Sequence, residues 1–343
     1  MRESCTKFMQ STVSVGDIRL RNRALLAPMS GVSDAPFRRL AWRFGAGMVV
    51  SEMVASEALS SGQEEMRLKV ENAGLPVHMV QLAGKDPAWM REATSIAEGS
   101  GADIIDINMG CPSKRVTNGY AGSALMRDLD HARRLIDAVV ETASVPVTLK
   151  MRLGWDESSI NAPQLARLAE DAGVQMITVH GRTRNQFYKG QANWSLVRDV
   201  RNATSLPLVV NGDIASTQQA RAALAASGAD AVMIGRASYG APWLPGQIGA
   251  NLDGHSPVAQ PRGSAFAELV GEHYEAMLAH YGVALGLRNA RKHLAWYSQW
   301  LDQSAIDGGI RKELMTSQDV YQIMSLIRIV FAGPLAENAR QAA

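Results

Sequence analysis

Two kinds of hydrophobic segment alternate along most of the chain. Short apolar runs rich in β-branched residues predict buried strands, and longer segments with apolar residues at three- and four-residue spacing predict amphipathic helices. The eight short runs are residues 24–28, 47–51, 77–82, 104–108, 147–151, 176–180, 208–211 and 231–235. Most of them are apolar at consecutive positions, which is typical of a parallel sheet covered by helices.

The longer segments predict the helices between these strands. We expect helices over residues 34–44, 87–98, 129–142, 162–171 and 217–226. Several of them are followed by glycine, which can adopt the left-handed conformation that ends a helix. Eight alternations favour a closed (β/α)₈ TIM barrel over an open sheet. A Rossmann fold is not supported, because no GxGxxG follows any predicted strand.

The alternation stops near residue 250, which divides the chain. A segment rich in Gly, Pro and Ser follows, and beyond it the pattern is helical throughout. We therefore expect a two-domain α/β protein with a tail at each end. The expected parts are a flexible tail over residues 1–15, the barrel over 16–252, a linker over 253–263, an all-helical domain over 264–335 and a flexible tail over 336–343.

Composition narrows the class of protein. The chain has 343 residues with a net charge of +2, which excludes a strongly basic nucleic-acid clamp but allows a local basic surface. Its two cysteines, Cys5 and Cys111, cannot form a disulfide framework or a Cys-rich zinc site, although a single bridge between them is an alternative. No apolar stretch reaches the ~18 residues of a membrane span. We expect a cytoplasmic protein with reduced thiols and no metal.

Polar residues recur where the predicted strands end. Five of them are Gln81, Asn108, Lys150, His180 and Asn211. The catalytic site of a TIM barrel lies at the carboxyl ends of its strands, so these side chains should converge on one mouth. Each one alone could equally begin a solvated loop, but five together favour a site.

The last two strand ends suggest a phosphate site. Asn211-Gly212-Asp213 opens one loop and Gly235-Arg236 opens the next. Glycines let backbone N–H groups approach an anion, and the loops after strands seven and eight are the usual phosphate site of such barrels. The alternative is that the glycines only permit the turns.

Three further residues carry candidate chemistry. Lys150 lies inside an apolar strand, where a charge is costly unless it is used or paired, for instance with Glu52. His180 could be a core imidazole or a site residue. Cys111 lies on a Gly–Cys–Pro turn just past a strand end, and a thiol with an ordinary pKa of about 8.5 is mostly protonated at neutral pH and can act as a general acid.

These residues belong to a series of motifs. They are APMSGVSDAPFR from Ala27, SEM from Ser51, IIDINMGCPSKRV from Ile104, AGSAL from Ala121, VTLKMRLGW from Val147, TVHGRTR from Thr178, VVNGDI from Val209, ADAVMIGRA from Ala229 and RNARKHLAWY from Arg288. Taken in order, the motifs resemble the tRNA-dihydrouridine synthase family, and most closely its bacterial B-type subfamily. The resemblance covers residues 16–331.

The resemblance implies a flavoenzyme that acts on tRNA. By position, the FMN site would comprise Pro28, Met29, Ser30, Gln81, Lys150, His180, Asn211, Gly212, Asp213, Gly235 and Arg236. NADPH would reduce the flavin, flavin N5 would deliver hydride to uracil C6, and Cys111 would protonate C5. Asn108 would orient the uracil. The B-type resemblance favours a D-loop uridine, and we expect a monomer.

A basic cluster in the helical part is the candidate RNA surface. Arg288, Arg291 and Lys292 share one face if the segment is helical, and this face could follow phosphates. We also assign Arg152 and Arg182, at the barrel mouth, to substrate binding. The alternative for the cluster is a solvated face above an aromatic core.

Two other functions remain open at this point. The first is a flavin enzyme acting on a free pyrimidine, against which the helical domain and its basic cluster argue. The second is an RNA-binding protein without catalysis, against which the presence of Cys111, Lys150 and His180 argues.

Overall fold

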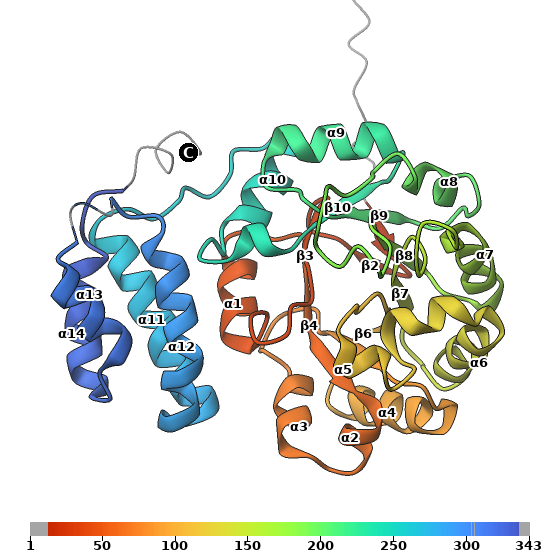
Figure 1. Ribbon diagram of the computed structural model, residues 1–343, viewed down its shortest axis with the longest axis horizontal. Coiled ribbons are helices and arrows are strands. Elements are labelled where there is room, and N and C mark those ends of the chain that lie inside the picture. The colour runs from red at the N-terminus through yellow and green to blue at the C-terminus, as the bar shows by residue number, and fades with distance from the viewer. Residues whose placement is uncertain (1–12, 303, 305, 336–343) are drawn as a thin grey trace, which may run out of the picture.

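The chain folds into a closed parallel barrel with a helical domain beside it, as the computed structural model in Figure 1 shows. The structure describes residues 13–302, 304 and 306–335. The barrel strands are β3 (Ala24–Leu26), β4 (Met48–Ala55), β5 (Met79–Ala83), β6 (Ile104–Met109), β7 (Val147–Arg152), β8 (Met176–His180), β9 (Leu208–Asn211) and β10 (Ala231–Ile234). Each strand pairs in parallel with the next, and β10 pairs with β3 to close the barrel. The predicted (β/α)₈ fold is confirmed.

Helices cover the outside of the barrel and surround its open end. They are α1 (Ala35–Arg43), α2 (Ser56–Ser60), α3 (Glu64–Val70), α4 (Pro87–Gly99), α5 (Lys114–Thr117), α6 (Leu129–Val140), α7 (Ala162–Ala172), α8 (Val197–Arg201), α9 (Thr217–Ser227) and α10 (Leu244–Leu252), with the 3₁₀ turns η1 (Gly122–Arg127) and η2 (Arg236–Ser238). Asp34, Asp86 and Asp128 accept backbone N–H bonds that begin α1, α4 and α6. The sequence did not predict α2, α3, α5, α8 and α10, most of which are too short to show a helical period.

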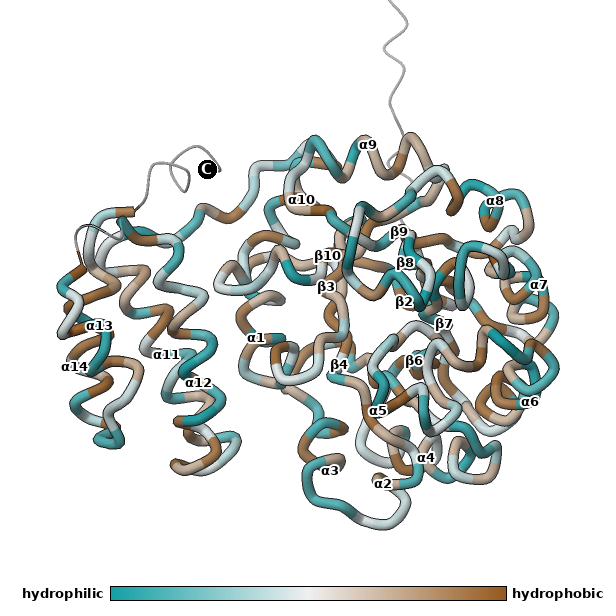
Figure 2. The backbone as a smooth tube through the Cα atoms, viewed as in Figure 1, coloured by the Kyte–Doolittle hydropathy of each residue, from teal (hydrophilic) through white to brown (hydrophobic). Residues whose placement is uncertain are grey.

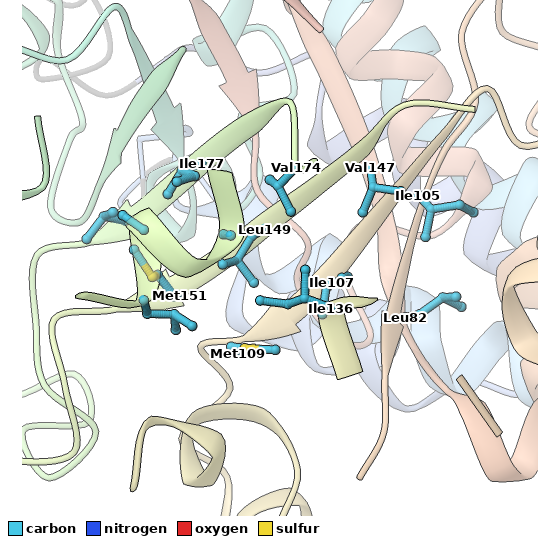
Figure 3. Packing of buried hydrophobic residues seen from close by; sticks show 14 of the residues in the cluster. Leu82, Ile105, Ile107, Met109, Ile136, Val147, Leu149, Met151, Val174 and Ile177 are labelled. Carbon is cyan, nitrogen blue, oxygen red and sulfur yellow. The ribbon is translucent and has the colours of Figure 1, made fainter. Parts of the chain in front are cut away.

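Side chains alternate between the two faces of each strand, and this separates two apolar layers. Figure 3 shows outward residues such as Ile105, Ile107 and Leu149 packing with Ile136 of α6 in the layer between the sheet and the helices. Inward residues near the beginning of the strands, including Met79 and Met176, form a second apolar cluster inside the barrel. The inward positions nearer the strand ends are polar, so the barrel is apolar at one end and polar at the other.

A small hairpin closes the apolar end of the barrel. Strands β1 (Ser14–Val15) and β2 (Ile18–Arg19) pair in an antiparallel manner. Val13, Val15 and Leu20 are buried against the inner apolar cluster. The predicted flexible tail of residues 1–15 is therefore wrong for residues 13–15, because their apolar side chains cover the bottom of the barrel. Residues 1–12, with Cys5, lie outside the described residues.

The C-terminal helices form a domain of their own beside α1 (Figure 1). They are α11 (Ser264–Tyr281), α12 (Val283–Ser298), α13 (Gly308–Thr316) and α14 (Val320–Val330), and residues 253–263, which lead into them, contain no helix or strand. Figure 2 shows hydrophobic and hydrophilic residues interspersed along all four, as expected when each helix buries one face. Phe266, Tyr297 and Phe331 pack edge to face in their shared core.

Candidate active site

A cavity of about 1750 Å³ opens at the polar end of the barrel and continues to the helical domain. Most of the predicted site residues line it. They are Pro28, Met29, Ser30, Gln81, Asn108, Cys111, Lys150, Arg152, His180, Asn211, Gly212, Asp213, Gly235, Arg236 and Arg288. Strand alternation explains this convergence, because the inward positions of neighbouring strands meet at the same level.

A chain of buried hydrogen bonds crosses the floor of the cavity. The Asp106 carboxylate accepts bonds from Thr148 Oγ1 (2.6 Å) and Gln81 Nε2 (2.6 Å). Gln81 Oε1 accepts from Asn108 Nδ2 at 2.7 Å, and Asn108 Oδ1 accepts from the Cys111 N–H at 2.9 Å. Because each amide both donates and accepts within this chain, its orientation is determined.

The series of hydrogen bonds begins at Asp106, which the sequence pattern had not been used to predict as a site residue. Asp106 is buried at the centre of the network, and burial raises its pKa although the bonds from Thr148 and Gln81 oppose this. The signal was available in the segment IIDIN, because Asp106 and Asn108 are two residues apart on one strand and so face the same side.

Cys111 follows β6 at the edge of the cavity and is a free thiol. Burial raises the pKa of this thiol, although the Ser113 N–H and the positive charges of Arg152 and Lys150 oppose the shift. The thiol is therefore protonated at neutral pH. It suits proton donation better than nucleophilic attack, which requires the thiolate.

Lys150 projects inward from β7 and is buried. Its Nζ donates to Asn211 Oδ1 at 3.3 Å, and no ion pair joins it to Glu52 among the described residues. Glu52 instead accepts the Gly31 N–H at 2.5 Å. Burial lowers the pKa of Lys150 to about 8, while Asp106 opposes the shift. Lys150 thus carries a positive charge at neutral pH and has N–H groups left for a ligand.

His180, Arg182 and Asp213 form a second network beneath the last strand ends. Arg182 Nη1 lies 3.2 Å from His180 Nε2, so Nε2 accepts and the proton of the ring is on Nδ1. Burial, with the positive charges of Arg152 and Lys150, holds the pKa of His180 well below its ordinary range. The imidazole is therefore neutral.

The loops after β9 and β10 have the features of an anion site. Among the described residues, the backbone N–H groups of Gly235 and Arg236 donate to no protein acceptor. The Arg236 guanidinium lies 4.7 Å from the centre of the Tyr188 ring and is half exposed. Two free N–H groups beside an accessible arginine match the needs of a phosphate. Tyr188, which sequence reasoning also missed, lies on an irregular loop with no pattern that could have shown it.

Comparison with known proteins identifies the family. The sequence profile described as dihydrouridine synthase matches residues 25–320. The chain belongs to the dihydrouridine synthase family. It is 52% identical to a protein of Rhizobium leguminosarum bv. phaseoli named as a probable tRNA-dihydrouridine synthase, over 94% of this chain and 99% of that protein. It is 45% identical to tRNA-dihydrouridine synthase B of Xanthomonas axonopodis pv. citri, over 85% of this chain and 89% of that protein. The predicted resemblance is confirmed.

Solved structures resemble this dihydrouridine synthase family member in fold alone. The old yellow enzyme homologue of Zymomonas mobilis superposes with a TM-score of 0.50 at 16% identity, over 70% of this chain and 92% of that one. Histamine dehydrogenase from Rhizobium sp. 4-9 gives a TM-score of 0.51 at 14% identity, over 78% of this chain and 51% of that one. Both likenesses concern the barrel architecture.

Arg182 does not contact the cavity, which corrects its assignment to substrate binding. Its side chain is 1% exposed, and all five of its N–H groups have acceptors within the protein. The acceptors are His180 Nε2, both oxygens of Asp213, and the carbonyl oxygens of Lys189 and Gly190. Arg182 therefore positions His180 and the loop after β9. The Asp213 carboxylate also accepts the Ala192 N–H at 2.7 Å and pairs with Arg236 Nη2 at 3.3 Å, so its charge is compensated within the protein.

Arg152 lines the cavity but is used chiefly to join two loops. Its Nε donates to Gly110 O at 2.8 Å, and its Nη1 donates to Thr183 O and Phe187 O, each at 2.8 Å. It thereby fastens the turn that carries Cys111 to the loop after β8.

The predicted basic face of α12 is split in the structure. Arg288 is exposed and lines the cavity. Arg291 instead turns toward α13, where Nη2 donates to the Ser317 carbonyl at 3.0 Å, and Lys292 turns toward Gly31 of the barrel. Neighbouring elements contact both of these side chains, so Arg288 is the member of the predicted phosphate-binding face that lines the cavity.

Two further properties concern only the part of the chain that the structure describes. No helix in it has the length and hydrophobicity that a bilayer crossing needs. No group of three or more His, Cys, Asp or Glu side chains is arranged there to bind a metal.

Proposed function

We propose that this chain is an FMN-dependent tRNA-dihydrouridine synthase that uses NADPH to reduce the C5–C6 double bond of a D-loop uridine. The observation that carries the proposal is the placement of the Cys111 thiol and an anion site in one cavity. The names of the relatives reported above support the tRNA substrate. We also propose that it acts as a monomer in the cytoplasm, where tRNA and NADPH are found.

The residues of the cavity fit FMN. The free N–H groups of Gly235 and Arg236, with the Arg236 guanidinium, suit its phosphate. Lys150 has unused N–H groups for the electron-rich edge of the ring system, and a fixed cation there stabilises negative charge. Pro28, Met29 and Ser30, at the end of β3, would line the flavin, and Gln81, His180, Asn211 and Gly212 of the same cavity would surround it. When bound and reduced by NADPH, FMN supplies the hydride that the C5–C6 bond needs at C6.

The protein supplies the proton and the orientation. A uridine flipped out of the tRNA would enter from the wide mouth. Cys111 Sγ would donate its proton to C5, which completes the addition of one hydride and one proton to the double bond. Asn108 holds the Cys111 backbone and retains an N–H for the uracil edge. Arg152 keeps the Cys111 turn against the neighbouring loop.

The size of the cavity favours a nucleotide within RNA over a free pyrimidine. Small-molecule sites commonly enclose about 300–1,000 Å³, whereas this cavity encloses about 1750 Å³ and reaches Arg288 and Asn289 of the helical domain. Residues so far from the strand ends would have no partner in a free base.

The test is nucleoside mass spectrometry with position mapping. Purified protein, NADPH and tRNA lacking dihydrouridine are incubated, with Cys111→Ala as the matched control. Conversion at one D-loop uridine by the wild-type protein only is the expected result. Reduction of free uracil without reduction of tRNA would instead establish the pyrimidine enzyme, and a protein without flavin or turnover would contradict the proposal altogether.

A further inference from the structure

Helix α12 contacts the two barrel loops that flank the closure between β3 and β10. The first loop, residues 27–34, follows β3, and the second, residues 235–243, follows β10. Both loops begin with residues that line the cavity, Pro28 to Ser30 in one and Gly235 and Arg236 in the other. The helical domain thus adjoins the part of the site where we propose that FMN binds.

The first contact joins Lys292 to the loop after β3. Gly31 has a φ of +72°, and a Cβ at this position would lie 2.8 Å from Lys292 Nζ. The other side of Gly31 is held by Glu52, whose carboxylate accepts the Gly31 N–H at 2.5 Å. Gly31 therefore lies between a cation of the helical domain and an anion of the barrel, next to Ser30.

The second contact joins Trp296 to the loop after β10. The Trp296 and Tyr239 rings stack with centroids 4.3 Å apart and planes 19° apart. A Cβ on Gly240, whose φ is +63°, would lie 2.6 Å from the Trp296 carbonyl carbon. The backbone of α12 thus rests directly on this loop, four residues beyond Arg236.

A third set of side chains fixes the direction of the helix. His293 lies between the two contacts and packs against Phe37 of α1, with ring centroids 5.7 Å apart. Tyr281, at the end of α11, donates to the Asp34 carboxylate at 3.0 Å, and that carboxylate also begins α1 by accepting the Phe37 N–H. Both loops are therefore attached to one rigid helix by buried or half-buried groups.

From this geometry we infer that α12 is a clamp on the cofactor loops, in which Lys292 and Trp296 are positioning residues for FMN. The inference rests on the proposed function. Phosphate contacts do not account for Lys292 and Trp296 of the RNARKHLAWY motif, because both side chains face the barrel. The clamp gives these two residues a role. A loop held in its binding conformation before the ligand arrives binds more tightly than a mobile one. The helical domain would then contribute to flavin binding in the absence of RNA.

The experiment measures FMN affinity of the apoprotein by flavin fluorescence, without tRNA. Lys292→Met and Trp296→Ala should each weaken FMN binding by about tenfold, because the loop then spends most of its time in other conformations. Lys292→Arg and Trp296→Phe should restore most of the affinity, since they keep the cation and the stacked ring. The midpoint potential of bound flavin should shift with Lys292→Met and not with Lys292→Arg.

A different contact between the barrel and the helical domain provides the control. Arg43 of α1 pairs with Glu272 of α11 at 2.7 Å on the surface, and neither side chain contacts Lys292 or Trp296 through a hydrogen bond or ion pair among the described residues. Glu272→Ala removes a domain contact of this kind and should leave FMN affinity unchanged. Circular dichroism and thermal melting of each apoprotein separate loss of folding from loss of binding.

The outcomes distinguish the two proposals. Wild-type affinity and potential in folded Lys292→Met and Trp296→Ala would overturn the clamp and leave the proposed function intact. Equal losses in Glu272→Ala would also overturn it, because docking in general would then be responsible. A wild-type protein that binds no FMN would overturn the proposed function, and the clamp with it.

Discussion

The guanidinium of Arg182 and the carboxylate of Asp213 meet in two parallel hydrogen bonds of 3.0 and 2.6 Å. The arginine is 1% exposed and the aspartate 30% exposed, so the pair is closed on one side and open to the cavity on the other. Through this pair the loop after β9 is fixed to His180, and Asp213 itself takes the left-handed backbone conformation with a φ of +56°. The anion site is thus built on an ion pair whose arginine is buried and whose aspartate is partly exposed.

Neutralising this aspartate should destabilise the protein. In Asp213→Asn the buried Arg182 loses its counter-charge. Because Asp213 is partly exposed, we expect this uncompensated charge to lower the free energy of unfolding by about 2–3 kcal/mol. Urea denaturation of the apoprotein measures the loss. The exposed pair of Arg91 and Glu141 is the control, since Glu141→Gln should cost less than about 1 kcal/mol. Equal losses of unfolding free energy in the two variants would show that the Arg182–Asp213 pair stabilises the protein no more than an exposed pair does.

Replacing the thiol should stop the reaction without disturbing binding. Cys111→Ala removes the proton donor, and loss of a general acid is expected to lower the single-turnover rate by about 10²–10⁴-fold. FMN and tRNA affinities should remain those of the wild type, because the Cys111 contact to Asn108 is made by the backbone. Undiminished turnover would remove Cys111 from the mechanism.

The same thiol sets a pH dependence. Burial raises the pKa of Cys111 above its ordinary value, so the proton that the reaction needs is present through neutral pH and lost only in the alkaline range. The single-turnover rate should therefore be level from pH 6 to about 8 and fall at higher pH. A fall that begins near neutrality would mean that the thiolate forms more readily than this environment allows.

Lys150 should make FMN affinity pH-dependent. Burial lowers its pKa to about 8, so its positive charge is present below this pH and lost as the pH rises through it. If the charge faces the electron-rich edge of the flavin, the dissociation constant should increase by about three- to tenfold between pH 7 and 9. Lys150→Met should bind more weakly at pH 7 and show no such increase. An identical pH profile in this variant would contradict the assignment.

Two arginines of α12 should have separable effects. Arg291→Ala removes a donor to the Ser317 carbonyl beside the end of α13 and should cost about 1–2 kcal/mol of stability, with little effect on RNA affinity. Arg288→Ala should leave stability unchanged, weaken tRNA binding and reduce the slope of log affinity against log salt by about 1. Thermal melting and filter binding at several salt concentrations measure both variants. Reversed effects would contradict the division of the basic cluster.

The sequence by itself determined the barrel and most of the site. Eight apolar runs separated by helices leave few alternatives to a closed parallel barrel, and the strand period of two then decides which side chains face inward. Gln81, Asn108, Lys150, His180 and Asn211 therefore line the cavity as predicted. The same period places Asp106 on the inward face with Asn108, so the sequence contained the information needed to predict it as a site residue.

Only the tertiary structure decided what the arginines and Lys292 contact. Arg288, Arg291 and Lys292 lie on one broad face of α12, but successive helical residues point about 100° apart. Arg291 and Lys292 therefore lie on either side of Arg288 and meet different neighbours, α13 on one side and Gly31 on the other. Arg182 likewise looks like a loop residue in sequence, yet the fold encloses it with five acceptors. A long flexible side chain takes its role from the surfaces that surround it, and a local pattern does not contain those surfaces.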